Sequence, residues 1–239
     1  MPTYRLYLEQ GPPLKRVPRR KTMVHVLDLL GCAPKAKSEE EALAATPPAI
    51  DDYRRWLRGI GEDTPLGDIQ LAITERWQGE DSWNGLGYMQ AAFQAELTPI
   101  DAAEVERLVC RFEAMKAVIT VALDSLPPDD LTAKPDAGRA LSGMALHVAD
   151  AAHGYVTAGL GRVGEPGSKP DRPWRMEWDR VMDAVAARLR AMTDDERTRI
   201  KYSRDKGYPW TARKVLRRVL EHTWEHVDEM VIERLGRTL

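Results

Sequence analysis

After about residue 98, apolar residues recur every three or four positions, and this periodicity restricts that part of the chain to helices. The first such segment begins near Thr98, a common N-cap residue, and ends at Pro127. Its apolar positions are Val105, Leu108, Phe112, Met115, Ile119 and Leu126. Similar segments cover about residues 139–160, 176–192 and 211–235. Four helices of this kind predict an all-α four-helix bundle, with a long connection between the third and the fourth helix.

The first 90 residues instead alternate between strand-like and helix-like patterns. Residues 4–8 and 22–27 predict two strands that pair as a hairpin, and residues 69–73 predict a further strand. Ser38, followed three residues later by Glu41, forms a capping box that starts a helix. A small domain with a short antiparallel sheet and a helix is therefore expected.

Two prolines lie inside the helical pattern of this small domain. Pro47 and Pro48 lack the backbone donor and crowd the preceding turn. Residues 49–57 are therefore expected to form a separate or kinked helix.

The predicted fold class is α+β, with a small N-terminal α/β domain at residues 1–90 and the helical bundle at residues 98–239. A length of 239 residues suits two domains of ordinary size.

Composition excludes several classes of function. Lysine plus arginine (35) nearly balance aspartate plus glutamate (37), and the net charge of -2 gives no electrostatic reason to expect nucleic acid or a membrane surface as a partner. No apolar run approaches the ~20 residues that span a bilayer. The N-terminus lacks the apolar core of a signal peptide, so a cytoplasmic location is expected. Cys32 and Cys110, without CxxC spacing, suggest neither a disulfide framework nor a thiolate zinc site.

Three histidines share the apolar faces of two predicted helices. His222 and His226 stand four residues apart, in one row with Val219 and Met230, and His147 lies on the apolar stripe of the second helix. Buried imidazoles need partners for their nitrogens, and a divalent cation satisfies three of them at once. An HxxxH pair alone also occurs by chance, so the spacing leaves an ordinary hydrogen-bonded role open.

Three segments together resemble the DinB/YfiT-like family of metal-dependent four-helix proteins: WTARKVL at residues 210–216, LEHTWEH at residues 220–226 and LHVAD at residues 146–150. The resemblance covers about residue 98 to the C-terminus. That family holds its metal on one histidine of the second helix and an HxxxH pair of the fourth. The matching positions here are His147, His222 and His226, so the resemblance implies that these three bind a divalent ion, with the catalytic residues left unassigned.

The N-terminal segment resembles the small HicB-type antitoxin fold. The resemblance rests on residues 26–33, where a glycine turn follows a strand, and on the helical start at residues 38–43. Because the chain continues into the metal bundle rather than a DNA-binding segment, neither toxin binding nor DNA binding is expected. The domain is instead expected to serve as an accessory or oligomerisation element, which is compatible with a homodimer, and ligand recognition is the alternative.

Relatives of the bundle include enzymes that use the metal to activate a low-molecular-weight thiol such as bacillithiol or mycothiol. The resemblance therefore implies a thiol-dependent transferase or isomerase that acts on a small-molecule substrate. Zinc and nickel both suit imidazole donors, so ligand type does not choose between them. Two alternatives stay open: a metal-dependent hydrolase, and a non-catalytic, stress-linked metal-binding protein.

Four residues outside the predicted ligand set have expected roles of their own. Asp150 and Glu229 each stand three residues beyond a predicted ligand and could orient an imidazole. His153 points about 120° away from His147 around the helix and is expected at the surface or an interface. His25 is expected to be structural.

Overall fold

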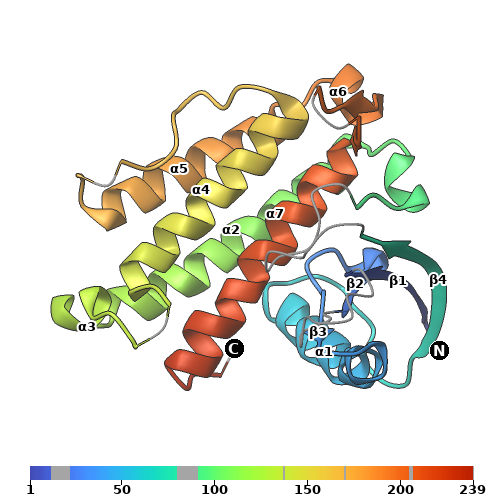
Figure 1. Ribbon diagram of the computed structural model, residues 1–239, viewed down its shortest axis with the longest axis horizontal. Coiled ribbons are helices and arrows are strands. Elements are labelled where there is room, and N and C mark those ends of the chain that lie inside the picture. Colours follow the sequence, from blue (N-terminus) through green and yellow to red (C-terminus); the bar gives the residue numbers. More distant parts are fainter. Residues whose placement is uncertain (12–21, 80–90, 137, 170, 205–206, 239) are drawn as a thin grey trace. The chain divides into compact units, whose positions relative to one another are not determined.

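A computed structural model describes residues 1–11, 22–79, 91–136, 138–169, 171–204 and 207–238 (Figure 1). The chain divides into two compact units. The first comprises Met1–Thr98 with Tyr202–Pro209, and the second comprises Pro99–Lys201 with Trp210–Leu239. The segment Tyr202–Pro209, which the sequence-based division places in the second domain, thus groups with the first unit. Independent folding of the two domains remains a prediction.

The first unit contains a four-stranded sheet in the order β3-β2-β1-β4. The strands are β1 (Thr3–Gln10), β2 (Thr22–Val26), β3 (Lys35–Ala36) and β4 (Gln70–Gln78). The predicted hairpin is confirmed, because β1 and β2 pair antiparallel with Tyr7 opposite His25. The expected antiparallel sheet is wrong in one respect, since β4 pairs parallel to β1 and the sheet is mixed. The chain passes through a helix before β4 and adds it to the free edge of β1, and such a crossover allows parallel pairing.

Helix α1 (Glu39–Gly59) packs beside this sheet and runs through both prolines. Its N-cap is the predicted Ser38, whose hydroxyl accepts the Glu41 backbone N–H at 3.2 Å. The separate helix expected after the prolines is not present. Buried residues on both sides of the proline pair lie along one stripe of the helix: Ala42, Thr46, Ile50, Tyr53 and Leu57. This shared apolar face explains why the helix stays continuous, because tertiary packing outweighs the local cost of proline.

Four long helices pack against one another in the second unit (Figure 1). They are α2 (Ala102–Asp124), α4 (Leu141–Leu160), α5 (Trp174–Arg190) and α7 (Ala212–Val227). Short elements in the described residues are η1 (Leu27–Leu29), η2 (Gln94–Leu97), α3 (Pro128–Thr132), α6 (Asp194–Thr198), the strand pair β5 (Lys201–Tyr202) with β6 (Pro209–Trp210), and the π-helical segment η3 (Asp228–Arg234).

A small mixed-sheet unit followed by a helical unit confirms the α+β fold class.

Helix α2 begins three residues later than predicted. Asp101, not Thr98, is its N-cap, and the Asp101 carboxylate accepts the Glu104 backbone N–H at 2.7 Å. Aspartate is the stronger N-cap residue of the two, which accounts for the difference.

Helices α4 and α7 approach closely at Gly159. A Cβ atom at this position would lie 2.1 Å from Cγ2 of Val215. Only glycine allows this separation, so the residue helps to set the distance between the two helices that carry the histidines. Within the described residues, no helix is both long and apolar enough to cross a membrane.

Candidate metal centre

Helix α7 presents two histidines to the interior. Its N-cap is Thr211, whose hydroxyl accepts the Lys214 backbone N–H at 3.1 Å. His222 and His226 follow one helical turn apart and are 4% and 6% exposed. Their ring centroids lie 4.7 Å apart with the planes at 88°. The i, i+4 spacing thus places both imidazoles side by side in a buried row.

Helix α4 supplies the third imidazole. The half-buried ring of His147 lies 5.1 Å from the His222 ring and 5.4 Å from the His226 ring, with interplanar angles of 83° and 90°. One ring nitrogen from each of the three residues lies within 4.8 Å of the others. The structure therefore brings together all three residues that the sequence singled out.

The three rings suit a shared cation. The lone pair of an unprotonated imidazole nitrogen lies in its ring plane, so three mutually perpendicular rings can direct lone pairs at one point without stacking. Two nitrogens on a tetrahedral zinc ion, each about 2.0–2.1 Å from the metal, would be about 3.4 Å apart. Because the observed limit is 4.8 Å, modest side-chain rotations would close the site around an ion.

Glu229 lies against His226 from the following segment of chain. Its Oε2 is 3.0 Å from Nδ1 of His226. A carboxylate at Nδ1 favours a proton there, which leaves Nε2 as the nitrogen for a metal. The helix changes at Asp228 from α-helical to π-helical. Such π segments are rare in proteins, and those that occur are often found at functional sites.

The electrostatic environment favours neutral His147. Burial lowers the pKa of His147 below its usual value, and the charge of Arg139 lowers it further, while Asp150 opposes the shift. The neutral imidazole is the form that binds metals.

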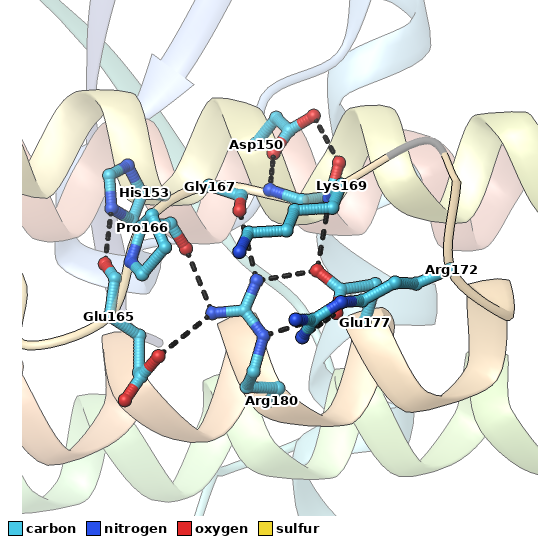
Figure 2. A network of polar contacts seen from close by, with 10 residues as sticks. Asp150, His153, Glu165, Pro166, Gly167, Lys169, Arg172, Glu177 and Arg180 are labelled. Carbon is cyan, nitrogen blue, oxygen red and sulfur yellow. Dashed lines mark hydrogen bonds and ion pairs between the residues drawn. The ribbon is translucent and has the colours of Figure 1, made fainter.

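Asp150 and His153 both hold the connection between α4 and α5 (Figure 2). The Asp150 carboxylate accepts the backbone N–H of Ser168 at 2.6 Å and the Ser168 hydroxyl at 2.7 Å. Nε2 of the half-buried His153 donates to the carbonyl oxygen of Glu165 at 2.9 Å. His153 is thus bound to a loop and lies outside the histidine cluster.

A buried carboxylate anchors the same connection from α5 (Figure 2). Glu177 accepts the Lys169 backbone N–H at 2.9 Å and pairs with Arg180 at 2.5 Å. Arg180 also donates to the carbonyl oxygens of Pro166 and Gly167. The hydrogen bond from Arg180, followed by that from Lys169, lowers the pKa of Glu177 to about 2, although desolvation opposes the shift.

Tyr155 and Arg218 also belong to the histidine region, and sequence reasoning missed both roles. The Tyr155 ring lies 5.9 Å from the His222 ring at 89°. Arg218 donates from Nη2 to the Tyr155 hydroxyl at 3.1 Å. The available signal was helical spacing, because Arg218 stands one turn before His222 and Tyr155 stands two turns after His147.

His25 lies in the first unit, on β2. Its Nε2 is 3.0 Å from Oε2 of Glu9, and both side chains are fully buried. This contact places His25 inside the sheet domain, as part of a polar pair in its core.

Comparisons with known proteins bear on the second unit. A family model described as the DinB superfamily matches residues 111–230. The matched segment runs from within α2 into η3 and includes all three histidines of the cluster. Searches of curated proteins and of solved structures found no match. The family match does not reach residues 1–90, where the HicB-type resemblance stays a prediction.

Proposed function

The chain belongs to the DinB superfamily, and on that basis we propose that it is a metal-dependent enzyme whose divalent ion is held by His147, His222 and His226. The single observation that carries the proposal is the convergence of three imidazoles from two helices within 4.8 Å. Zinc and nickel are ions that imidazole donors suit.

The proposed site leaves coordination positions for a substrate. Among the described residues, the cluster has three members, and no carboxylate or thiol joins it. Three protein ligands are typical of catalytic sites, whereas structural zinc sites use four. A divalent ion at this place would act as a Lewis acid and lower the pKa of a coordinated thiol.

We assign the site to a transferase or isomerase that uses a low-molecular-weight thiol. In a transfer reaction, the thiol sulfur forms a bond to an electrophilic carbon, the leaving group departs with the bonding electron pair, and the thiol proton passes to solvent. The protein contributes ligands that favour the metal-binding form: the Glu229 carboxylate lies 3.0 Å from Nδ1 of His226, and burial lowers the pKa of His147.

Turnover by untagged protein, loaded with zinc or nickel, tests this assignment. A panel of thiols with an aromatic electrophile should give metal-dependent thioether formation in the wild type. His222→Ala and His226→Ala should remove this activity, while His153→Ala, whose ring bonds the Glu165 carbonyl oxygen outside the histidine cluster, should retain it. Thiol-independent ester hydrolysis would favour a hydrolase instead. Bound metal without turnover in either assay would favour the non-catalytic alternative.

A further inference from the structure

A cationic and phenolic pair lies next to the histidine cluster, between the same two helices. Arg218 and Tyr155 are 4% and 8% exposed. The Arg218 guanidinium carbon lies 4.8 Å from the centre of the Tyr155 ring, and Nη2 donates to the hydroxyl at 3.1 Å. The Tyr155 ring in turn lies 5.9 Å from the His222 ring. Two short contacts therefore connect the guanidinium to a proposed metal ligand.

The chemistry of this pair suits an anion. A guanidinium carries five N–H donors in a planar fork that matches a carboxylate. The Tyr155 oxygen accepts from Arg218, so its own O–H remains available as a donor to a further group. A positive charge and a hydroxyl donor thus lie together, in a buried place where charge-assisted hydrogen bonds are strong.

The position of the pair limits the size of its ligand. Arg218 and His222 are one helical turn apart, which is about 6 Å along the axis of α7. The guanidinium bonds the Tyr155 hydroxyl, and the Tyr155 ring lies 5.9 Å from the His222 ring, so a thiol bound through sulfur at the histidines needs only a short spacer to bring an anionic group to this pair. A short thiol with a terminal carboxylate meets this requirement.

We propose that Arg218 and Tyr155 bind the carboxylate of the thiol cosubstrate, an inference that rests on the proposed metal-dependent function. The pair acts as a specificity element that selects carboxylate-bearing thiols over neutral ones. Arg218 supplies the charge, and Tyr155 holds the guanidinium by its hydroxyl and its ring face.

Cobalt-substituted protein gives a direct test, since its visible spectrum reports a change in the coordination sphere. Titration with 3-mercaptopropionate and with the neutral analogue 3-mercaptopropanol compares a carboxylate with a hydroxyl on the same carbon chain. The wild type should bind the acid about tenfold or more tightly than the alcohol, which is the size expected of a charge-assisted pair.

Variants of the pair separate its contribution from that of the metal. Arg218→Gln should bind both thiols equally, with cobalt content and affinity for the alcohol unchanged. Arg218→Lys, a smaller perturbation that keeps the charge, should leave part of the preference, and Tyr155→Phe should reduce it while the ring stays in place. Circular dichroism of each variant establishes that the helices are intact.

Two results would overturn the proposal while leaving the metal site standing: equal affinity of wild-type protein for both thiols, or an unchanged preference in folded Arg218→Gln. Failure of the cobalt protein to respond to either thiol would instead refute the proposed function, and the carboxylate site with it.

Discussion

Replacing Gly159 with alanine should destabilise the helical unit, because α4 and α7 have no room for a methyl group there. The new Cβ would lie 2.1 Å from Cγ2 of Val215 and 3.2 Å from Cε3 of Trp210, so the helices or the valine must move. Overpacking of this kind costs about 1–3 kcal/mol. Alanine also gains about 0.8–1.0 kcal/mol of helix propensity over glycine. The expected net effect is a loss of about 0–2 kcal/mol.

Gly154 offers a matched control on the same helix. It is exposed, and a Cβ atom there would meet nothing within 4 Å. Gly154→Ala should therefore gain the helix propensity alone. Gly159 is the next-to-last residue of α4, so alanine gains no more propensity there than at Gly154, and the difference between the variants should be at least about 1–3 kcal/mol from the close approach itself. Urea denaturation of the metal-free protein, followed by circular dichroism, measures both. Equal midpoints for the two variants would refute the account of how α4 and α7 pack.

Two further predictions concern carboxylates. Glu177→Gln should lower the stability of the folded protein at neutral pH and make that stability less dependent on acid. The pKa of Glu177 falls from 4.5 to about 2 on folding, so its carboxylate stabilises the folded state above about pH 4.5. This contribution is lost as the pH falls towards about 2, and the variant should not show that loss. Thermal unfolding of wild type and variant between about pH 2 and pH 7 tests this prediction, and the same pH profile for both proteins would contradict it. Glu229→Gln should weaken metal binding about 10–100-fold by releasing the His226 ring. Competition with a chelator measures the affinity, and a wild-type value would show that Glu229 does not support the site.

The histidine cluster could be predicted because helical geometry is local and regular. The four-residue spacing of His222 and His226 fixes their common face, and the apolar stripe of α4 fixes the face of His147. Periodicity does not specify which helices are neighbours. The family resemblance supplied the pairing of the second helix with the fourth. Once α4 and α7 are adjacent, the three rings meet.

Other features of the structure depend on contacts between elements, which the sequence pattern within one element does not specify. The α1 helix continues through Pro47 and Pro48 because its buried stripe extends beyond them on both sides. The parallel pairing of β4 with β1 follows from the path of the chain, which the alternation within a strand does not specify. Arg218 and Tyr155 have ordinary helical positions, and their relation appears only when the two helices are placed together.

Metal content of untagged protein tests the central claim most directly. After reconstitution with zinc or nickel and gel filtration, elemental analysis should find about one ion per wild-type chain, which is the capacity of a single three-histidine site. His147→Ala, His222→Ala and His226→Ala should each lose the ion, and His153→Ala should keep it. A wild-type chain without metal, or the same metal content in all four variants, would contradict the assignment of these three histidines as metal ligands.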